Sequence, residues 1–242
     1  MTNTKYVKSA LWKDDSQRIR AQKKVQAAAK AFLKQYPEGF EDPALSALAK
    51  RHKMSAIVAY AKAHLSQMEQ GRLPERALEI KATAIQLINK SSMVSLFEKP
   101  KFRDALNSFS HEETQRFALG LWELLHGQRA MGFTMLQELL TPYGIAKWPV
   151  LTAFLCYCEP EENLLVKPTT VKGVIAYFDF EDLKYPTKPN YEFYQTYNGR
   201  MCWLAKQVDA SLSPTMAHFS GFLMMVLEGL SATNNSVVEF GE

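Results

Sequence analysis

Apolar residues recur along most of the chain at the three- and four-residue spacing of a helix, and no segment alternates with the two-residue period of a strand. The stretch from about Ser16 to Gln35 is the first example, with Val25 and Phe32 on its apolar side. Asp14 can cap the free amides at its start, and Pro37 ends it. Basic residues lie between the apolar ones, so the pattern predicts an amphipathic, strongly basic helix.

The same spacing continues to the end of the chain. Ser110 and Glu113 have the spacing of a capping box, and the proline after Trp148 is typical of a helix start. Gly229 is the predicted end of the last helix, and residues 231–242 are predicted to form a loose tail. The predicted fold class is all-α. We expect a multi-helix orthogonal bundle, and a division into two helical subdomains is the alternative. Further helices are predicted over about 75–88, 110–127, 131–140, 148–157, 167–178, 190–208 and 213–229.

Residues 42–65 form a candidate helix-turn-helix. Asp42 and Pro43 begin a first short helix, the chain turns near Lys53, and Ser55 caps a second helix. In a helix-turn-helix protein the second helix enters the major groove of DNA. Lys53 stands where that motif usually has a glycine, so either Lys53 adopts a left-handed conformation or the turn differs from that of the motif. A helical hairpin inside a bundle produces the same pattern, so both interpretations stay open.

Length and composition allow a packed core but no familiar catalytic motif. The chain has 242 residues, 47% of them hydrophobic and 22% charged, which is enough for one large domain or two small ones. It has only 11 glycines, and it lacks the G-x-x-x-x-G-K-[ST], G-x-G-x-x-G and G-x-S-x-G patterns. Nucleotide-binding loops of these types and a hydrolase nucleophile elbow are therefore excluded.

The formal net charge of +4 conceals an asymmetry along the chain. Residues 1–90 contain 17 Lys and Arg against 8 Asp and Glu, whereas residues 91–242 contain 12 against 17. The change of sign places a candidate subdomain boundary near residue 90. Cations gathered on one face favour anionic partners such as nucleic acid, and solvated helix faces are the alternative interpretation.

Cysteine and histidine spacing gives no metal or disulfide framework. The chain has three cysteines, which cannot all pair and which suit a reducing cytosol. Cys156 and Cys158 are two apart on a predicted helix and point in different directions, so we expect them in the core. His111 and Glu112 begin an H-E-x-x-H pattern, but Gln115 replaces the second histidine. We expect neither metal nor cofactor.

Apolar segments are too short for a membrane protein. The longest runs, near 148–158 and 222–227, fall short of the roughly 20 residues that cross a bilayer. The first residues of the chain lack the apolar run of a signal peptide. We therefore expect a cytoplasmic protein without a membrane partner.

Two segments resemble known families. The segments 96–127, LFEKPKFRDALNSFSHEETQRFALGLWELLHG, and 143–178, with its Trp-Pro, apolar helix and Lys-Pro, resemble an uncharacterised bacterial family of helical proteins. The arrangement, over roughly 96–230, is distantly similar to the helix-hairpin-helix DNA glycosylase superfamily. That resemblance implies a hairpin at 143–147 that contacts the DNA backbone.

The match to the superfamily is partial at its functional positions. Gly144 stands at the first hairpin glycine, but Ala146 stands at the second, where a β-carbon hinders approach to phosphate. Thr169 follows Lys167-Pro168 where the superfamily has its catalytic aspartate. The resemblance therefore implies a helix-hairpin-helix-like module over 91–230 that keeps the scaffold but lacks the catalytic aspartate of the superfamily.

Three hypotheses of function follow. The first is a non-catalytic nucleic-acid-associated module that contacts DNA or RNA phosphates. The second is a protein-interaction or scaffold component of a bacterial system. The third is a diverged glycosylase-like enzyme with a pocket near Lys147, Thr169 and Tyr191. No catalytic residue is assigned, and the candidate nucleic-acid-binding residues are Arg18, Arg20, Lys23, Lys24, Lys50, Arg51, Lys53 and Lys147.

Overall fold

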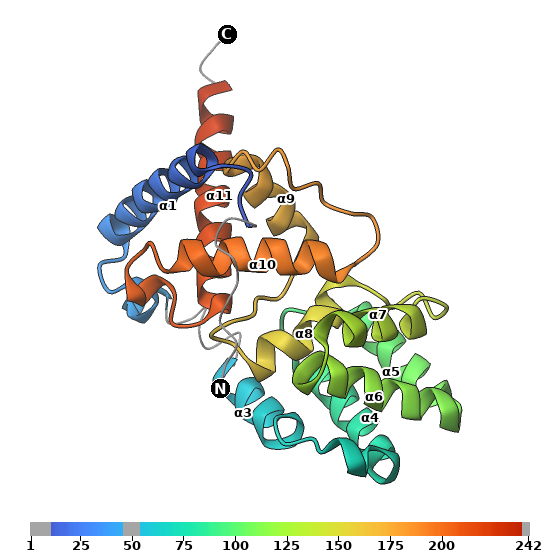
Figure 1. Ribbon diagram of the computed structural model, residues 1–242. Coiled ribbons are helices and arrows are strands. Elements are labelled where there is room, and N and C mark those ends of the chain that lie inside the picture. Colours follow the sequence, from blue (N-terminus) through green and yellow to red (C-terminus); the bar gives the residue numbers. More distant parts are fainter. Residues whose placement is uncertain (1–10, 46–53, 239–242) are drawn as a thin grey trace.

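The computed structural model describes residues 11–45 and 54–238, with side chains described up to residue 230 (Figure 1). The described part is built from α-helices and short 3-10 turns and has no β-strand, which confirms the predicted all-α fold. The elements are α1 (Asp15–Gln35), η1 (Gly39–Glu41), η2 (Pro43–Leu45), α3 (Met54–Leu65), η3 (Gln70–Arg72), α4 (Leu73–Lys90), α5 (Glu98–Ser108), α6 (His111–His126), α7 (Arg129–Leu140), α8 (Trp148–Cys158), α9 (Pro168–Tyr177), α10 (Tyr191–Ala205), η4 (Ala210–Leu212) and α11 (Met216–Val238).

Local signals set several helix starts. The Gln17 backbone N–H donates to the Asp14 carboxylate at 2.7 Å, so Asp14 caps α1 as predicted. The capping box of α6 is complete: Ser110 N donates to Glu113 Oε2 at 2.8 Å, and Glu113 N donates to Ser110 Oγ at 3.2 Å. α4, α8 and α9 each have a proline in the first turn, where its missing N–H costs no hydrogen bond.

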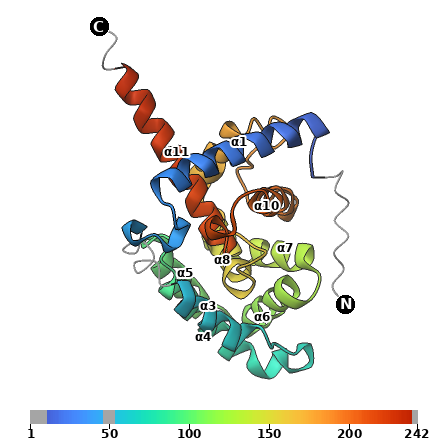
Figure 2. The ribbon, with the colours of Figure 1, turned by 90° about the vertical axis from the view of Figure 1, so that its left-hand side faces the viewer.

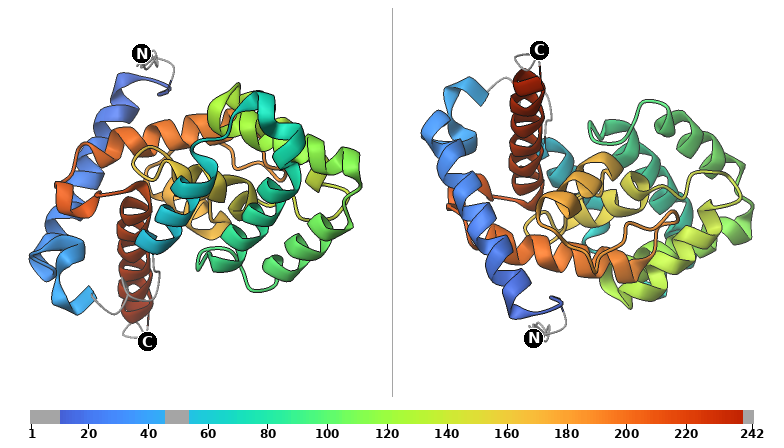
Figure 3. Two further views of the ribbon diagram at one scale, coloured as in Figure 1. Left: turned by 90° about the horizontal axis from the view of Figure 1, so that it is seen from below. Right: turned by 90° about the horizontal axis from the view of Figure 1, so that it is seen from above.

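The helices form two groups that share one continuous apolar core. The α6 group consists of α3 to α8, in which α6 packs against α4, α7 and α8. The α10 group consists of α1, α9, α10 and α11. α10 joins the groups because it also packs on α7, and Figure 3 shows α1 crossing α10 near the end of α10 that lies away from the α6 group.

Contacts cross the boundary predicted near residue 90. α1 packs on α10, about 170 positions later in the chain, and α4 packs on α5 and α6. The helices described before residue 90 therefore do not pack only among themselves, although the charge asymmetry of the sequence changes sign there.

The last helix differs from its predicted range. α11 continues to Val238, past Gly229, and its end projects from the body of the molecule (Figure 2). The predicted helix end at Gly229 is wrong, because the positive-φ glycines of the described chain are Gly39 and Gly144 and not Gly229. Without the left-handed conformation of a helix-ending glycine, Gly229 is tolerated inside the helix.

The candidate helix-turn-helix is only partly described. Its start forms the 3-10 turn η2, and its second helix is α3, which packs on α4 and α8. The intervening residues 46–53, which include Lys50, Arg51 and Lys53, lie outside the described residues. Among the helices that are described, none has the length and apolarity needed to cross a membrane.

Candidate functional site

The candidate cations on α1 divide into two sets. Arg18 and Lys24 are half-buried and make contacts within the protein, whereas Arg20 and Lys23 are exposed. The sequence does not distinguish the two sets, because all four lie within about two turns of the same helix.

Lys24 and Arg18 are used to attach α1. Lys24 Nζ donates to the Tyr177 carbonyl at 2.7 Å and pairs with Asp179 Oδ2 at 2.6 Å. Asp179 adopts a positive φ of 54°, a conformation that Asp tolerates better than most residues. The Arg18 guanidinium pairs with Asp15 at 2.9 Å and lies 5.9 Å from the centre of the Trp203 ring. These two cations are less available to a partner.

The exposed cations form a line along α1, which we call the α1 stripe. It consists of Arg20, Lys23, Lys30 and Lys34, whose spacing of three, seven and four residues keeps them on one face of the helix. Its ends are 14 residues apart, or about 21 Å at the rise of an α-helix. Within the described chain, none of the four makes an ion pair. The stripe is a row of solvated positive charges.

A buried arginine attaches the start of α1 to α10. The Arg200 side chain is only 2% exposed, and its Nε donates to the Leu11 carbonyl at 2.6 Å. Its two terminal nitrogens donate to the carboxylate of Asp182, which also accepts from Gln17 Nε2 at 2.8 Å. The guanidinium lies beside two aromatic rings that contact each other, with centroid distances of 5.3 Å to Trp12 and 4.8 Å to Phe180.

The environment of Asp182 keeps its carboxyl ionised. Burial acts to raise its pKa, but the hydrogen bonds from Arg200 and Gln17 outweigh burial and lower the pKa below its usual value. At the start of α1, the contact with Arg200 and Gln17 therefore depends on the negative charge of the Asp182 carboxylate.

Lys147 lies far from α1 in the sequence and at a different kind of site. It is exposed, it is the N-cap residue of α8, and it lines a cleft of about 740 Å³. The cleft also includes the start of α5, the end of α7, the first residue of α9 and the loop that contains Tyr185 and Lys188. A concave site near Lys147 was expected for an enzyme, but Thr169 and Tyr191 are not among the lining residues.

The hairpin implied by the glycosylase resemblance is an ordered turn between α7 and α8. Gly144 adopts a positive φ of 68°, which explains the glycine at this position. The Tyr143 hydroxyl donates to Glu113 Oε1 at 2.6 Å, and this hydrogen bond lowers the pKa of Glu113. Ile145 is buried, so the turn is fixed to the α6 group on both sides of Gly144.

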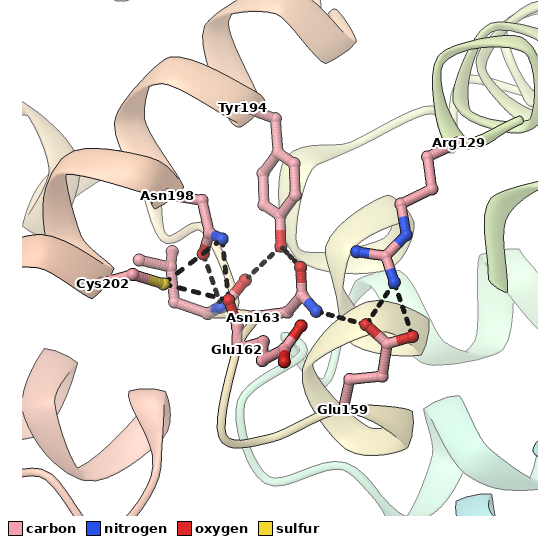
Figure 4. Close-up of polar contacts among 8 residues, drawn as sticks. Arg129, Glu159, Glu162, Asn163, Tyr194, Asn198 and Cys202 are labelled. Carbon is pink, nitrogen blue, oxygen red and sulfur yellow. Dashed lines mark hydrogen bonds and ion pairs between the residues drawn. The ribbon is translucent and has the colours of Figure 1, made fainter. Parts of the chain in front are cut away.

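A polar network joins α7, α8 and α10 (Figure 4). Arg129 Nη2 lies 2.6 Å from both carboxylate oxygens of Glu159, and Asn163 Nδ2 donates to Glu159 Oε2 at 2.7 Å. The Tyr194 hydroxyl donates to Asn163 Oδ1 at 3.1 Å. Tyr194 and Asn163 are each 2% exposed, so these polar groups satisfy one another inside the protein.

The same network fixes the chain after α8. Asn198 Nδ2 donates to the Glu162 carbonyl at 2.8 Å and its Oδ1 accepts from Leu164 N at 3.0 Å. The Cys202 thiol donates to the Glu162 carbonyl at 3.1 Å, and burial raises the pKa of Cys202 to about 11. A protonated, hydrogen-bonded thiol is a poor nucleophile, which favours a structural role for the network.

The cysteines of α8 and the aromatic residues of α10 are mainly core residues. Cys156 and Cys158 are buried, as expected, and burial raises the pKa of Cys156 to about 12. Phe193, Tyr194 and Tyr197 are buried, whereas Tyr191 and Trp203 are partly buried. In the chain as described, no three His, Cys, Asp or Glu side chains cluster closely enough to hold a metal ion.

Sequence reasoning missed Arg200 and Trp148 as residues of interest. Arg200 lies on the apolar side of α10, three residues after Tyr197 and four before Leu204, and an arginine on such a face signals a buried ion pair. Nothing in the sequence points to Asp182 as its partner.

Comparison of this chain with family models, with curated proteins and with solved structures gives no match. The similarity to the helix-hairpin-helix superfamily therefore stays a prediction. Conclusions about function depend on the geometry of the α1 stripe and of the cleft at Lys147.

Proposed function

We propose that this protein binds the phosphate backbone of nucleic acid through the α1 stripe, without base-specific contacts. The observation that carries the proposal is the row of four exposed cations on one helix face, none of them ion-paired within the described residues. Phosphates of DNA and RNA are regularly spaced anions, and lysine and arginine side chains contact them without reading the sequence.

The way in which α1 is held supports the proposal. Arg200, Asp182 and Lys24 attach its inner face to the α10 group, so the outer face is presented by a fixed helix. A fixed row of cations loses less conformational entropy on binding than a disordered basic segment does. Helix α1 also lies at the edge of the molecule, where a long polyanion can approach it (Figures 1 and 3).

Salt dependence tests the proposal directly. Four phosphates neutralised on duplex DNA give a slope of log K against log salt of about −3.6, or an affinity loss of about 10²-fold between 50 and 200 mM salt. Fluorescence anisotropy with a labelled 25-bp duplex measures this slope. The variant Arg20→Gln/Lys23→Gln/Lys30→Gln/Lys34→Gln should lower its magnitude by about 3.6.

A matched variant controls for net charge. Arg72, Lys101, Arg116 and Lys184 are exposed cations outside α1, and replacing them with Gln changes the charge by the same amount. The control should leave the slope nearly unchanged. The proposal is overturned if the duplex does not bind at 50 mM salt, if both variants act alike, or if poly-glutamate binds as tightly as the duplex.

A further inference from the structure

The cleft at Lys147 combines features that the α1 stripe lacks. Three lysines line it, Lys99, Lys147 and Lys188, against a single acidic residue, Glu98. Lys99 Nζ donates to the Asn89 carbonyl at 3.0 Å, so one of these ammonium groups has a fixed position. The volume of about 740 Å³ lies within the range of small-molecule sites. The cleft is therefore a concave surface of positive charge.

The first turn of α8 adds backbone donors to this surface. Trp148 and Pro149 line the cleft, and no side chain caps the helix. Pro149 has no N–H, so the free N–H groups of this turn are those of Trp148 and Val150. The first N–H groups of a helix have no partner within it, and together with the helix dipole they favour an anion. α8 has 11 residues, long enough for this effect.

Two residues of the lining, Trp148 and Glu98, each have a polar atom that is closed to solvent and has no hydrogen-bond partner, and these atoms point independently to a ligand. Trp148 is only 3% exposed, and its indole Nε1 has no hydrogen-bond acceptor. Glu98 Oε2 is likewise buried and has no donor. A buried donor and a buried acceptor without partners are unfavourable, and a ligand that offers both an acceptor and a donor would satisfy them. Since neither atom is open to solvent, such a ligand has to move side chains of the lining.

The apolar part of the lining suits a flat group. The Tyr185 and Trp148 rings lie 6.2 Å apart at an angle of 44°, and prolines and the Met93 and Leu96 side chains complete the surface. Aromatic rings stack on planar heterocycles, whereas an inorganic anion would leave these groups without contacts.

We propose that the cleft binds a nucleoside monophosphate. Its phosphate lies at Lys147, Lys188 and the first turn of α8, its base lies against Tyr185, and the polar edge of the base meets Trp148 Nε1 and Glu98 Oε2. The two possible sources of this chemistry are a free nucleotide and the phosphorylated end of a nucleic-acid strand. The proposal does not depend on the function proposed for α1.

The Trp148 indole provides a direct readout. The protein has four tryptophans, so the ¹⁵N–¹H spectrum has four indole signals. The Trp148 signal is assigned with Trp148→Phe and, independently, from its proximity to Phe193, whose ring centre is 5.4 Å away. Titration with AMP, GMP, CMP and UMP should shift this signal with a dissociation constant below about 1 mM for at least one nucleotide. Inorganic phosphate and the four unphosphorylated nucleosides should bind at least about tenfold more weakly.

Two exposed lysines form a matched pair for the test. Lys147 lines the cleft and Lys184 does not, and neither is buried, so both substitutions should leave the fold intact. Lys147→Gln should weaken nucleotide binding about tenfold, and Lys184→Gln should leave it unchanged. A 5′-phosphorylated decathymidylate that shifts the Trp148 signal at lower concentration than the free nucleotides would identify a strand end as the source.

Several results would overturn the proposal. They are the absence of a Trp148 shift at 5 mM of every nucleotide, equal binding of inorganic phosphate and nucleotides, and equal effects of Lys147→Gln and Lys184→Gln. The four-residue α1 variant separates the two proposals, because it should lose duplex binding and keep nucleotide binding.

Discussion

Helices α6 and α7 are held together by close packing, whereas α1 and α10 are held together by buried charge. At the first contact the added β-carbon of an alanine at Gly132 would lie 2.7 Å from Glu123 C and 2.7 Å from Gly120 O, so only glycine permits the observed approach. At the second contact Arg200 and Asp182 form a hydrogen-bonded ion pair beside Trp12.

The two contacts differ in how far apart the contacting residues are along the chain and in whether those residues are charged. α6 and α7 are consecutive helices, and their contact contains backbone and apolar side chains that do not titrate. The α1–α10 contact joins residues that are up to 189 positions apart and depends on ionised groups. The helix proposed to bind nucleic acid is therefore attached by the contact that responds to pH.

Removing the buried arginine should have the largest effect. Arg200→Met leaves the Asp182 carboxylate without its partner and should lower the free energy of unfolding by about 3 kcal/mol, the low end for a broken buried pair because Asp182 is partly exposed. Urea unfolding measures the change, and amide exchange should show the loss of protection in α1 first.

The double variant Arg200→Met/Asp182→Asn removes both charges and serves as the control. It should recover a large part of the lost stability, because an unpaired charge is no longer held near the core. A loss below about 1 kcal/mol in the single variant would mean that the ion pair does not hold α1.

Adding a β-carbon at Gly132, where α6 and α7 meet, should have the next largest effect on stability. Gly132→Ala forces the backbones of α6 and α7 apart and should cost about 2 kcal/mol. Gly229→Ala, also in a helix, meets no atom within 4 Å and should be neutral or stabilising by up to about 1 kcal/mol. Equal unfolding midpoints for the two variants would show that α6 and α7 can separate without cost.

Acid should act on the α1–α10 contact before the α6–α7 contact. The pKa of Asp182 is lowered in the folded protein, so the carboxylate contributes stability above its unfolded pKa, about 3.9 for a free Asp. That contribution is lost as the pH falls through the folded value. The difference in unfolding free energy between the wild type and Asp182→Asn should therefore shrink from pH 6 to pH 3, whereas the effect of Gly132→Ala should not change.

Adjacent lysines on α1 should give the smallest and most specific differences. Lys24→Gln removes the ion pair with Asp179 and should cost about 0.5 kcal/mol of stability. Lys23→Gln should leave stability unchanged and lower the magnitude of the salt slope for duplex binding by about 0.9. Identical binding curves for the two variants would contradict the division of the α1 cations into attached and solvated sets.

Local features of the fold could be predicted from the sequence, and long-range ones could not. The Asp14 cap, the Ser110–Glu113 capping box and the proline at the start of α8 involve residues within one turn, and all are present. The helix end at Gly229 was predicted wrongly because the sequence does not show whether a glycine lies inside a helix or ends it. Only the φ angle of the glycine distinguishes the two cases.

The candidate site shows the same limit. Periodicity identifies α1 as basic, but the separation of Lys24 from Lys23 depends on Asp179, far away in the chain. The cleft at Lys147 is assembled from five separate segments, and the unpartnered indole of Trp148 is visible only once they are in place. The spacing of residues within one segment does not show which distant segments come together to form a cleft or an ion pair.

The attachment of α1 also has a consequence for the order of folding during synthesis. Gln17 is made 165 residues before its partner Asp182, and Leu11 is made 189 residues before Arg200. At ribosomal rates of 5–20 residues per second, Gln17 is made about 8–33 s before Asp182. Throughout that interval α1 is a basic amphipathic segment whose apolar side has nowhere to dock. Docking of the start of α1 through Asp182 and Arg200 is therefore a late event in the synthesis of the chain.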